Sequence, residues 1–585
     1  MKNVYSLIAC CIVSIVLLQY RLSYSGLESK HELKITTWDA LGYYMYLPGI
    51  FIYRDVTALK WLPEIDKKYG LSGGHVYQAN IYKDNKYVFK YLGGVAMLET
   101  PFFLIGHLIA RKFHYDADGF SAPYQYSLAF GVLIYCLLAV FLLRSILLRY
   151  FSDLTVAITL LLLMLATNII QYVAIDSAQS HGYIFPLYVV MIYLTIKWHE
   201  KPGLFLAAMI GYVIGLASIS RPTEAIMLFI PLLWGTETKE SAKEKWSFVR
   251  KHKNHVYFAL LFAFLGVLPQ LIYWQIATGF FIYDVGSKWT FLNPFFRVLI
   301  GWQKGWFIYT PVTVFFIAGM FYLKSYPFKK SVLWFCLLNI YIVISWFDWR
   351  YGGSYSTRAL SQSYPVFALP LAAYIEQVNQ KKWRFFFYGL GLYLIGVNLF
   401  QIVQYNKQIL HYDQMNRTYY GRIYLNPDPT PLDMSTLDTN EYLGNENRYQ
   451  LKVIAHTDTS RKIQSKGSNL VLLLETSLGL DSTTVKSAEV WLKIESEIKV
   501  SRGFWDSYLT SEVETNGLRK RNSVRLFSVI SKEGQTNNYA FYVRVRVEAG
   551  ANKTILRIYI NPKSDFEGTL EKLRVTSLFG NFESS

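Results

Sequence analysis

A single acidic residue stands in an aromatic run shortly after the first apolar segment of the chain. The run extends from Thr36 to Pro48 and contains Asp39 between Trp38 and Ala40. A carboxylate near an apolar surface loses hydration, so we expect the pKa of Asp39 to rise. A raised pKa suits a general base that takes a proton from a hydroxyl. Equally, Asp39 is a normal cap for a helix that begins near Ala40, and the residues alone leave both interpretations open.

Further polar residues lie in or beside apolar runs, where water is scarce. Glu99 lies within an apolar run, a costly position unless the carboxyl group faces a cavity or a partner. Asp176 and His181 flank a short turn before another apolar run, and Tyr43 lies in the same aromatic run as Asp39. These four side chains are candidates for an acceptor site, either lining it directly or supporting the residues that line it. Each also has a structural interpretation, and for a single histidine in a turn that interpretation is the more frequent one.

The residues themselves give little indication of a metal or cofactor site. The four cysteines lie inside apolar runs and lack metal-ligand spacing. Asp116 and Asp118 form an acid-x-acid pair that is compatible with a divalent ion. The pair stands beside Gly119 before an apolar run, so we interpret it as a loop that caps a helix.

The composition indicates a membrane protein. Of the 585 residues, 52% are hydrophobic, 17% are aromatic and only 17% are charged, whereas soluble proteins carry about 25% charge. This excludes a disordered chain and an ordinary cytosolic enzyme. The net charge of +18 would suit nucleic acid, but we attribute it to lysines and arginines in cytoplasmic loops and expect no nucleic-acid partner.

Eleven apolar stretches are candidates for membrane-spanning helices, because a span needs about 20 mostly apolar residues. The segment 91–110 is a possible twelfth, but glycines and Pro101 interrupt it, so we expect it to lie at the membrane surface or to enter only partway. The eleven stretches are 4–20, 122–143, 154–173, 183–197, 204–219, 222–235, 256–277, 308–323, 331–347, 359–375 and 384–403.

The distribution of positive charge predicts the topology. With eleven spans and a cytoplasmic N-terminus, the short inside loops contain clusters such as the lysines and arginines of 239–253, whereas the short outside turns contain only Arg221. This bias follows the positive-inside rule, and it would invert downstream if 91–110 also spanned. We therefore expect 21–121, 278–307 and 404–585 on the outer face, with the C-terminus outside.

The chain changes character after residue 403. We predict a transmembrane domain over 1–403 with a large first outer loop at 21–121, a connector over 404–429, and an extracytoplasmic domain over 430–585. In the last part, apolar and polar residues alternate in Leu470–Thr476, Ala488–Ile494, Tyr539–Val547 and Thr554–Ile560, separated by turn residues. Alternation of this kind predicts antiparallel strands, and we expect a β-sandwich.

Several short motifs, all predicted on the outer side, resemble those of one group of membrane enzymes. Their shared order over about residues 30–375 resembles bacterial members of the GT-C glycosyltransferase superfamily, which includes protein O-mannosyltransferases and lipid A aminoarabinose transferases. The chain departs from the usual pattern at Leu92, where proline is expected, and at Thr357, where glycine is usual. The motifs are Asp39 in the first outer loop, Tyr91–His107, Ser177–Gly182, Ser220–Thr223, Gln303–Gly305 in the place of an Arg-His-Gly turn, and Asp348–Arg358.

This resemblance implies a polytopic α-helical membrane fold with about eleven transmembrane helices, followed by the all-β domain. It also implies a donor that is a sugar on a polyprenyl phosphate, and a glycan, lipid or protein acceptor at the outer face of a bacterial cytoplasmic membrane. Asp39 then acts as the base, and Arg358, Arg350 and Lys304 are candidates for holding the donor phosphate. Enzymes of this superfamily with monophosphate donors generally need no metal.

Two other functions remain open on the sequence alone. A transporter or a flippase for lipid-linked sugars would need ionisable residues deep in the spans and usually has related halves, and the sequence shows neither feature clearly. A membrane scaffold whose β-domain binds an envelope polymer would depend on 430–585 rather than on the charges of the outer loops.

Overall fold

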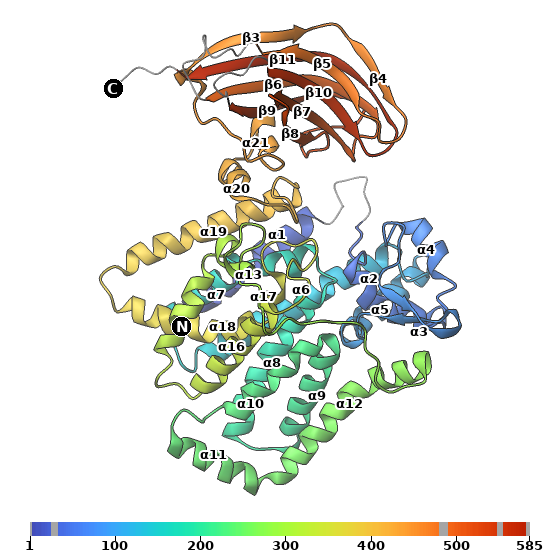
Figure 1. Cartoon of the computed structure of the whole chain (residues 1–585). Helices are drawn as coiled ribbons and strands as arrows, with labels where there is room; N and C mark the ends of the chain where they lie inside the picture. Colours follow the sequence, from blue (N-terminus) through green and yellow to red (C-terminus); the bar gives the residue numbers. More distant parts are fainter. Residues whose placement is uncertain (1–2, 25–32, 479–488, 547–553, 581–585) are drawn as a thin grey trace. The chain divides into compact units, whose positions relative to one another are not determined.

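The computed structural model describes the chain apart from residues 1–2, 25–32, 479–488, 547–553 and 581–585. The chain divides into two compact units, Met1–Ile402 and Val403–Ser585. The first unit is mainly helical, and the second unit is mainly β-structure (Figure 1).

All eleven predicted stretches are largely helical. Four helices in the described part of the chain are long and apolar enough to cross a membrane: α1 (Val4–Ser23), α6 (Ala122–Leu147), α12 (Lys253–Thr278) and α19 (Arg384–Asn406). The remaining longer helices of this unit are α5 (Gly94–Lys112), α7 (Asp153–Leu165), α8 (Ser180–Glu200), α9 (Leu204–Ser220), α11 (Lys239–Lys251), α16 (Lys329–Ile344) and α18 (Tyr364–Asn379).

Four of the predicted spans are interrupted, which hydropathy alone did not reveal. The stretch 359–375 divides at residues 362–363 into α17 (Arg358–Ser361) and α18. The stretch 154–173 divides into α7 and a π-helix at Gln171–Ile175. The stretch 222–235 begins as a 3₁₀ helix, Pro222–Leu228, and continues as α10 (Phe229–Leu233). The stretch 308–323 contains the end of α14 (Trp306–Tyr309), then α15 (Thr313–Gly319) and a 3₁₀ turn. The number of spans therefore stays a prediction.

Glycines allow α9 and α12 to pack closely. A Cβ atom on Gly211 would lie 1.9 Å from the carbonyl oxygen of Ala259, and one on Gly215 would lie 2.3 Å from that of Ala263. Neither distance is possible for real atoms, so side chains are excluded at both positions. Such small-residue contacts are typical of helices that pack within a membrane.

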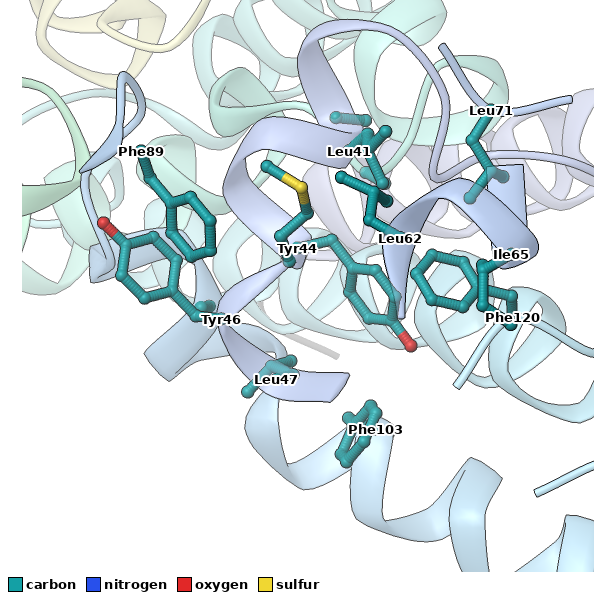
Figure 2. Packing of buried hydrophobic residues seen from close by; sticks show 14 of the residues in the cluster. Leu41, Tyr44, Tyr46, Leu47, Leu62, Ile65, Leu71, Phe89, Phe103 and Phe120 are labelled. Atoms are coloured by element: carbon teal, nitrogen blue, oxygen red, sulfur yellow. The ribbon is translucent and has the colours of Figure 1, made fainter. Parts of the chain in front are cut away.

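The predicted first outer loop is a packed structure rather than an open loop. It contains α2 (Asp39–Tyr44), α3 (Tyr46–Phe51), α4 (Leu62–Tyr69) and the two-stranded sheet of β1 (Ala79–Ile81) and β2 (Tyr87–Phe89). Buried side chains from α2, α3 and α4 form one hydrophobic core with Phe103 of α5 and with Phe120 (Figure 2). This core holds the start of α2 in a fixed position, and Asp39 is the first residue of that helix.

The second unit contains two antiparallel sheets with a shared apolar core. One sheet has the strand order β5-β10-β7-β8, and the other has the order β3-β11-β6-β9 with β4 also paired to β11. The four predicted strands correspond to β5, β6, β9 and β10, although the predicted ends Ala488 and Val547 lie outside the described residues. The strands are β3 (Tyr449–Thr457), β4 (Arg461–Ser465), β5 (Val471–Ser477), β6 (Glu489–Arg502), β7 (Ser507–Thr515), β8 (Leu518–Arg525), β9 (Thr536–Arg546), β10 (Thr554–Pro562) and β11 (Phe566–Gly580), preceded by α20 (Arg417–Ile423) and α21 (Pro431–Ser435).

Candidate active site

A cavity of about 690 Å³ lies within the helical unit, where segments far apart in the sequence meet. Its walls come from seven segments. The first four are the start of α2, the segment 77–92, the turn before α8 and the C-terminal end of α9. The others are the loop 285–289, the end of α16 and the loop that leads into α17 (Arg358–Ser361). Its charged lining residues are Asp39, Lys90, Arg221, Asp348 and Arg358. Two acids and three cations therefore face the same space.

Asp39 is bonded to three side chains from distant parts of the chain. Its Oδ1 atom accepts hydrogen bonds from the hydroxyl groups of Tyr77 (2.8 Å) and Tyr91 (2.6 Å). Its Oδ2 atom accepts a hydrogen bond of 2.5 Å from Nη2 of Arg358. Trp38 rather than Asp39 is the N-cap residue of α2, and the hydrogen bonds of the Asp39 carboxylate within the described residues come from these three side chains, so the capping interpretation does not describe this structure.

These partners reverse the direction that we expected for the pKa of Asp39. Burial alone favours the neutral acid, as the sequence suggested. The charge of Arg358 and the hydrogen bonds from Tyr91, Tyr77 and Arg358 together outweigh burial and lower the pKa of Asp39 to about 2. The prediction of a raised pKa was therefore wrong for this state of the protein, because the sequence could not show that a cation lies against the carboxylate.

The residue before Asp39 has an unusual backbone conformation. Trp38 has a φ of 53° and a ψ of −126°, a region that bulky residues rarely adopt. Its backbone N–H donates to the carbonyl of Leu71 at 3.1 Å, and its carbonyl accepts from Nε2 of Gln78 at 3.0 Å. Such strain persists only where the surroundings fix it, and here it sets the direction from which Asp39 enters the cavity.

Arg358 is held from two sides at the start of α17. Its Nη2 atom contacts Asp39, and its Nη1 atom donates to Oε1 of Gln179 at 2.8 Å. Its side chain is 12% exposed, so it retains a small face toward the cavity. Gly352 has a φ of 62°, and a Cβ atom there would lie 3.5 Å from Nη2 of Arg358. The loop 348–357, named the Gly-Gly loop after Gly352 and Gly353, thus passes directly beside the guanidinium group.

A second polar network lines another part of the cavity. His181 Nδ1 lies 2.5 Å from Oε1 of Gln362, whose Nε2 atom donates to Glu224 at 2.6 Å. Nη1 of Arg221 contacts both Nδ1 of His181 and Oε1 of Gln362 at 3.4 Å. Within the described residues, Arg221 has no carboxylate within ion-pair distance. Tyr188 completes the network through a hydrogen bond to Glu224.

Lys304 bonds to the backbone of the Gly-Gly loop, and Arg350 is a residue of that loop. Nζ of the buried Lys304 donates to the carbonyl of Arg350 at 2.8 Å and to that of Gly352. The exposed Arg350 guanidinium lies 5.5 Å from the ring centroid of Trp349. Neither residue is among the described residues that line the cavity. The phosphate-binding role that we predicted for both stays a prediction.

The other candidates occupy different places. Tyr43 and His181 line the cavity, and the ring of Tyr43 packs edge-on against Tyr91 with centroids 4.7 Å apart. Asp176 accepts a hydrogen bond of 3.0 Å from Gln171 and is not among the lining residues. Glu99 is fully buried in α5, and its carboxyl oxygens have no hydrogen-bond partner among the described residues.

The acid-x-acid pair is a loop element. Lys68 Nζ lies 2.8 Å from Asp116 and 2.9 Å from Asp118. Oδ1 of Asp118 also accepts the backbone N–H groups of Phe120 and Ser121, and Ser121 is the residue before α6. In the described part of the chain, no group of three or more histidines, cysteines or acids is arranged to hold a metal ion.

Sequence reasoning did not select Tyr77, Gln179 or Gln362 for the site. Tyr77 and Gln179 contact the Asp39–Arg358 pair directly, and Gln362 joins His181 to Glu224. Gln179 stands within the Ser177–Gly182 motif, and that position was the available signal. Tyr77 and Gln362 lie outside every quoted motif, so only their position in space reveals them.

No protein-family description and no curated protein matches the chain. Among solved structures, the chain matches the archaeal oligosaccharyltransferase AglB from Archaeoglobus fulgidus in complex with an inhibitory peptide and a dolichol-phosphate, with 12% identity and a TM-score of 0.40. That match covers 72% of this chain and 57% of the archaeal chain, and the apo form of the A. fulgidus oligosaccharyltransferase gives the same values with 58% of its chain covered. This chain thus spans less than two thirds of the archaeal one, and a similarity this low carries no argument about its function.

Proposed function

We propose that this protein is an inverting glycosyltransferase that moves a sugar from a polyprenyl-phosphate donor to an acceptor at the outer face of a bacterial cytoplasmic membrane. The observation that carries the proposal is the direct contact between Asp39 and Arg358 in the wall of a 690 Å³ cavity. A carboxylate and an arginine at one cavity are the two groups that transfer from a phosphate leaving group needs, one for the acceptor proton and one for the phosphate.

In the proposed reaction, the acceptor hydroxyl oxygen attacks the anomeric carbon of the donor sugar and forms the new C–O bond. The bond between that carbon and the phosphate oxygen breaks, and polyprenyl phosphate leaves with the electron pair. Asp39 takes the hydroxyl proton. The attack and the departure occur on opposite faces of the sugar, so the configuration at the anomeric carbon inverts.

The contact with Arg358 gives the donor a way to activate Asp39. While Arg358 holds the carboxylate, the low pKa makes Asp39 a weak base. A donor phosphate competes for the same guanidinium group, because phosphate oxygens match its fork of N–H groups. We propose that donor binding draws Arg358 toward the phosphate and so raises the basicity of Asp39 only when a donor is present.

Arg221 is proposed as a second cation for the donor phosphate. It lines the same cavity and contacts two neutral groups, the side chains of His181 and Gln362. A cation without a carboxylate partner at a partly enclosed site favours an anionic ligand. Tyr43 and His181 line the remaining wall and are proposed to contact the acceptor.

The test uses the full-length protein in lipid nanodiscs with undecaprenyl phosphates that carry radiolabelled glucose, mannose or aminoarabinose, together with an extract of envelope glycans and lipids as acceptors. Wild type is expected to release undecaprenyl phosphate and to label an acceptor. Asp39→Asn is expected to reduce turnover by about 10²–10⁴-fold, as loss of a general base does. Asp116→Asn is the matched control, because it makes the same change in the first loop at an exposed acid.

Full turnover by a folded Asp39→Asn protein would overturn the assignment of the base. A second assay uses the full-length protein in sealed vesicles. Movement of the labelled lipid between the two leaflets of these vesicles without any glycosylated product would overturn the enzymatic proposal and favour the flippase.

A further inference from the structure

Helix α11 carries an exposed basic stripe that the proposed reaction does not use. The stripe consists of Lys239, Lys243, Trp246 and Arg250, all of them exposed. Their spacing of four, three and four residues places them within about 60° of the helix circumference, because each residue advances the helix by about 100°. The acids Glu240 and Glu244 lie outside this sector. In the part of the chain that the structure describes, none of the three cations has an acidic partner.

The other side of α11 is fixed to the protein. Lys245 is buried, and its Nζ atom donates to the carbonyls of Pro231 (2.6 Å) and Trp234 (2.7 Å) at the end of α10. Thr238 begins the helix with a capping box. The basic stripe therefore lies on a different side of α11 from the buried Lys245.

Helix α11 leads directly into a helix with the character of a membrane span. After the non-helical residue His252, α12 begins at Lys253. The most apolar 18 residues of α12 have a mean hydropathy of 2.0. Its exposed side chains include Tyr257, Leu260 and Phe264. Only 17% of these 18 residues are buried in the protein. Figure 1 shows α11 meeting α12 at an angle, at the lower edge of the helical unit. A helix that turns away from the end of a span is placed at the membrane surface.

We infer that α11 lies at the membrane surface with its stripe bound to the head groups of anionic phospholipids. Lysine and arginine are attracted to anionic lipids, and tryptophan prefers the interface between head groups and acyl chains. The stripe therefore combines the two residue types that such a surface selects. The apolar surface of α12, which continues from α11, places the stripe at the level of the head groups. This inference does not depend on the proposed glycosyl transfer.

Hydrogen–deuterium exchange of the full-length protein in nanodiscs tests the inference. One set of nanodiscs contains phosphatidylcholine alone, and the other contains phosphatidylcholine with phosphatidylglycerol. We expect the backbone of residues 239–251 to exchange roughly tenfold more slowly with phosphatidylglycerol, because each basic residue adds to the attraction. High salt should abolish most of the difference, since it screens exposed charges.

The variant Lys239→Gln/Lys243→Gln/Arg250→Gln should lose the dependence on phosphatidylglycerol. The matched control is Lys462→Gln/Lys466→Gln/Lys532→Gln, which removes three exposed charges from the β-unit and should keep the dependence. Exchange in the largely buried helix α8 shows whether the stripe variant is folded, and exchange in strands β6 and β11 does the same for the control in the β-unit. Equal exchange of α11 in both lipid compositions would overturn the inference, as would persistence of the lipid effect in the folded stripe variant. A single Lys243→Gln variant, with a smaller expected loss, serves if the triple variant does not fold.

Discussion

Arg358 lies 2.5 Å from Asp39 across 319 residues of sequence, and it holds the carboxylate ionised inside a cavity. The same guanidinium group has a small exposed face and a second contact to Gln179. The pair therefore joins the group proposed as the base to the group proposed to bind the leaving phosphate. A change in one of the two residues should alter the behaviour of the other.

Replacement of Arg358 by glutamine should change both donor binding and the pH profile. Loss of a phosphate contact should raise KM for the polyprenyl-phosphate sugar by about 10–100-fold, in line with a charge-assisted hydrogen bond. The acid limb of kcat/KM should move to higher pH, because Asp39 loses the cation that lowers its pKa. Initial rates between pH 4 and pH 9 measure both effects. Arg111→Gln, at an exposed arginine that does not line the cavity, serves as the control, and equal shifts in both variants would contradict a specific role for Arg358.

Protein stability should depend on the ionisation of Asp39. The pKa of Asp39 is lowered from 3.8 to about 2 in the folded protein, so its contribution is complete above about pH 5 and is lost as the pH falls from about 4 toward 2. The contribution is about 2 kcal/mol, since one pKa unit corresponds to about 1.4 kcal/mol. Thermal unfolding of wild type and Asp39→Asn across this range should show a gap in Tm that narrows below pH 4. A constant gap would contradict the linkage.

Arg221→Gln should weaken donor binding without moving the acid limb of the pH profile. Arg221 contacts His181 and Gln362 rather than Asp39, so the base keeps its pKa. KM for the donor should rise by about tenfold while kcat changes little, as expected when an interaction made equally in the ground state and transition state is lost. An unchanged KM in the folded variant would remove Arg221 from the donor site while leaving the test of Asp39 unaffected.

Trp38 offers a test of backbone strain beside the proposed base. Trp38→Gly and Trp38→Ala both remove the indole, but only glycine adopts the φ of 53° and ψ of −126° without strain. The glycine variant should therefore be more stable than the alanine variant by about 1–3 kcal/mol, the usual cost of such a conformation. Chemical denaturation compares the two. Greater stability of the alanine variant would show that the backbone relaxes when the side chain is removed.

Local pattern in the sequence was sufficient to locate the helices and several strands. Long apolar runs predicted helical segments because hydropathy is a property of neighbouring residues. The alternation of apolar and polar residues is also a property of neighbouring residues, and it predicted β5, β6, β9 and β10. The breaks in the stretches 154–173 and 308–323 were missed. At Asn168, for example, the side chain donates to the carbonyl of Tyr355, a partner 187 residues away that no local window contains.

The sequence by itself determined that this is a largely helical chain rich in apolar segments, with a β-rich C-terminal unit, and it selected Asp39 and Arg358 by residue type and motif. Only the tertiary structure decided that these two residues touch, that Tyr77, Tyr91 and Gln179 complete their surroundings, and that Lys304 bonds to loop carbonyls. The pKa of Asp39 shows the physical reason. Burial, which a run of aromatic neighbours indicates, raises the pKa, but the larger combined effect comes from charges and hydrogen bonds whose distances are set by the packing of the whole unit.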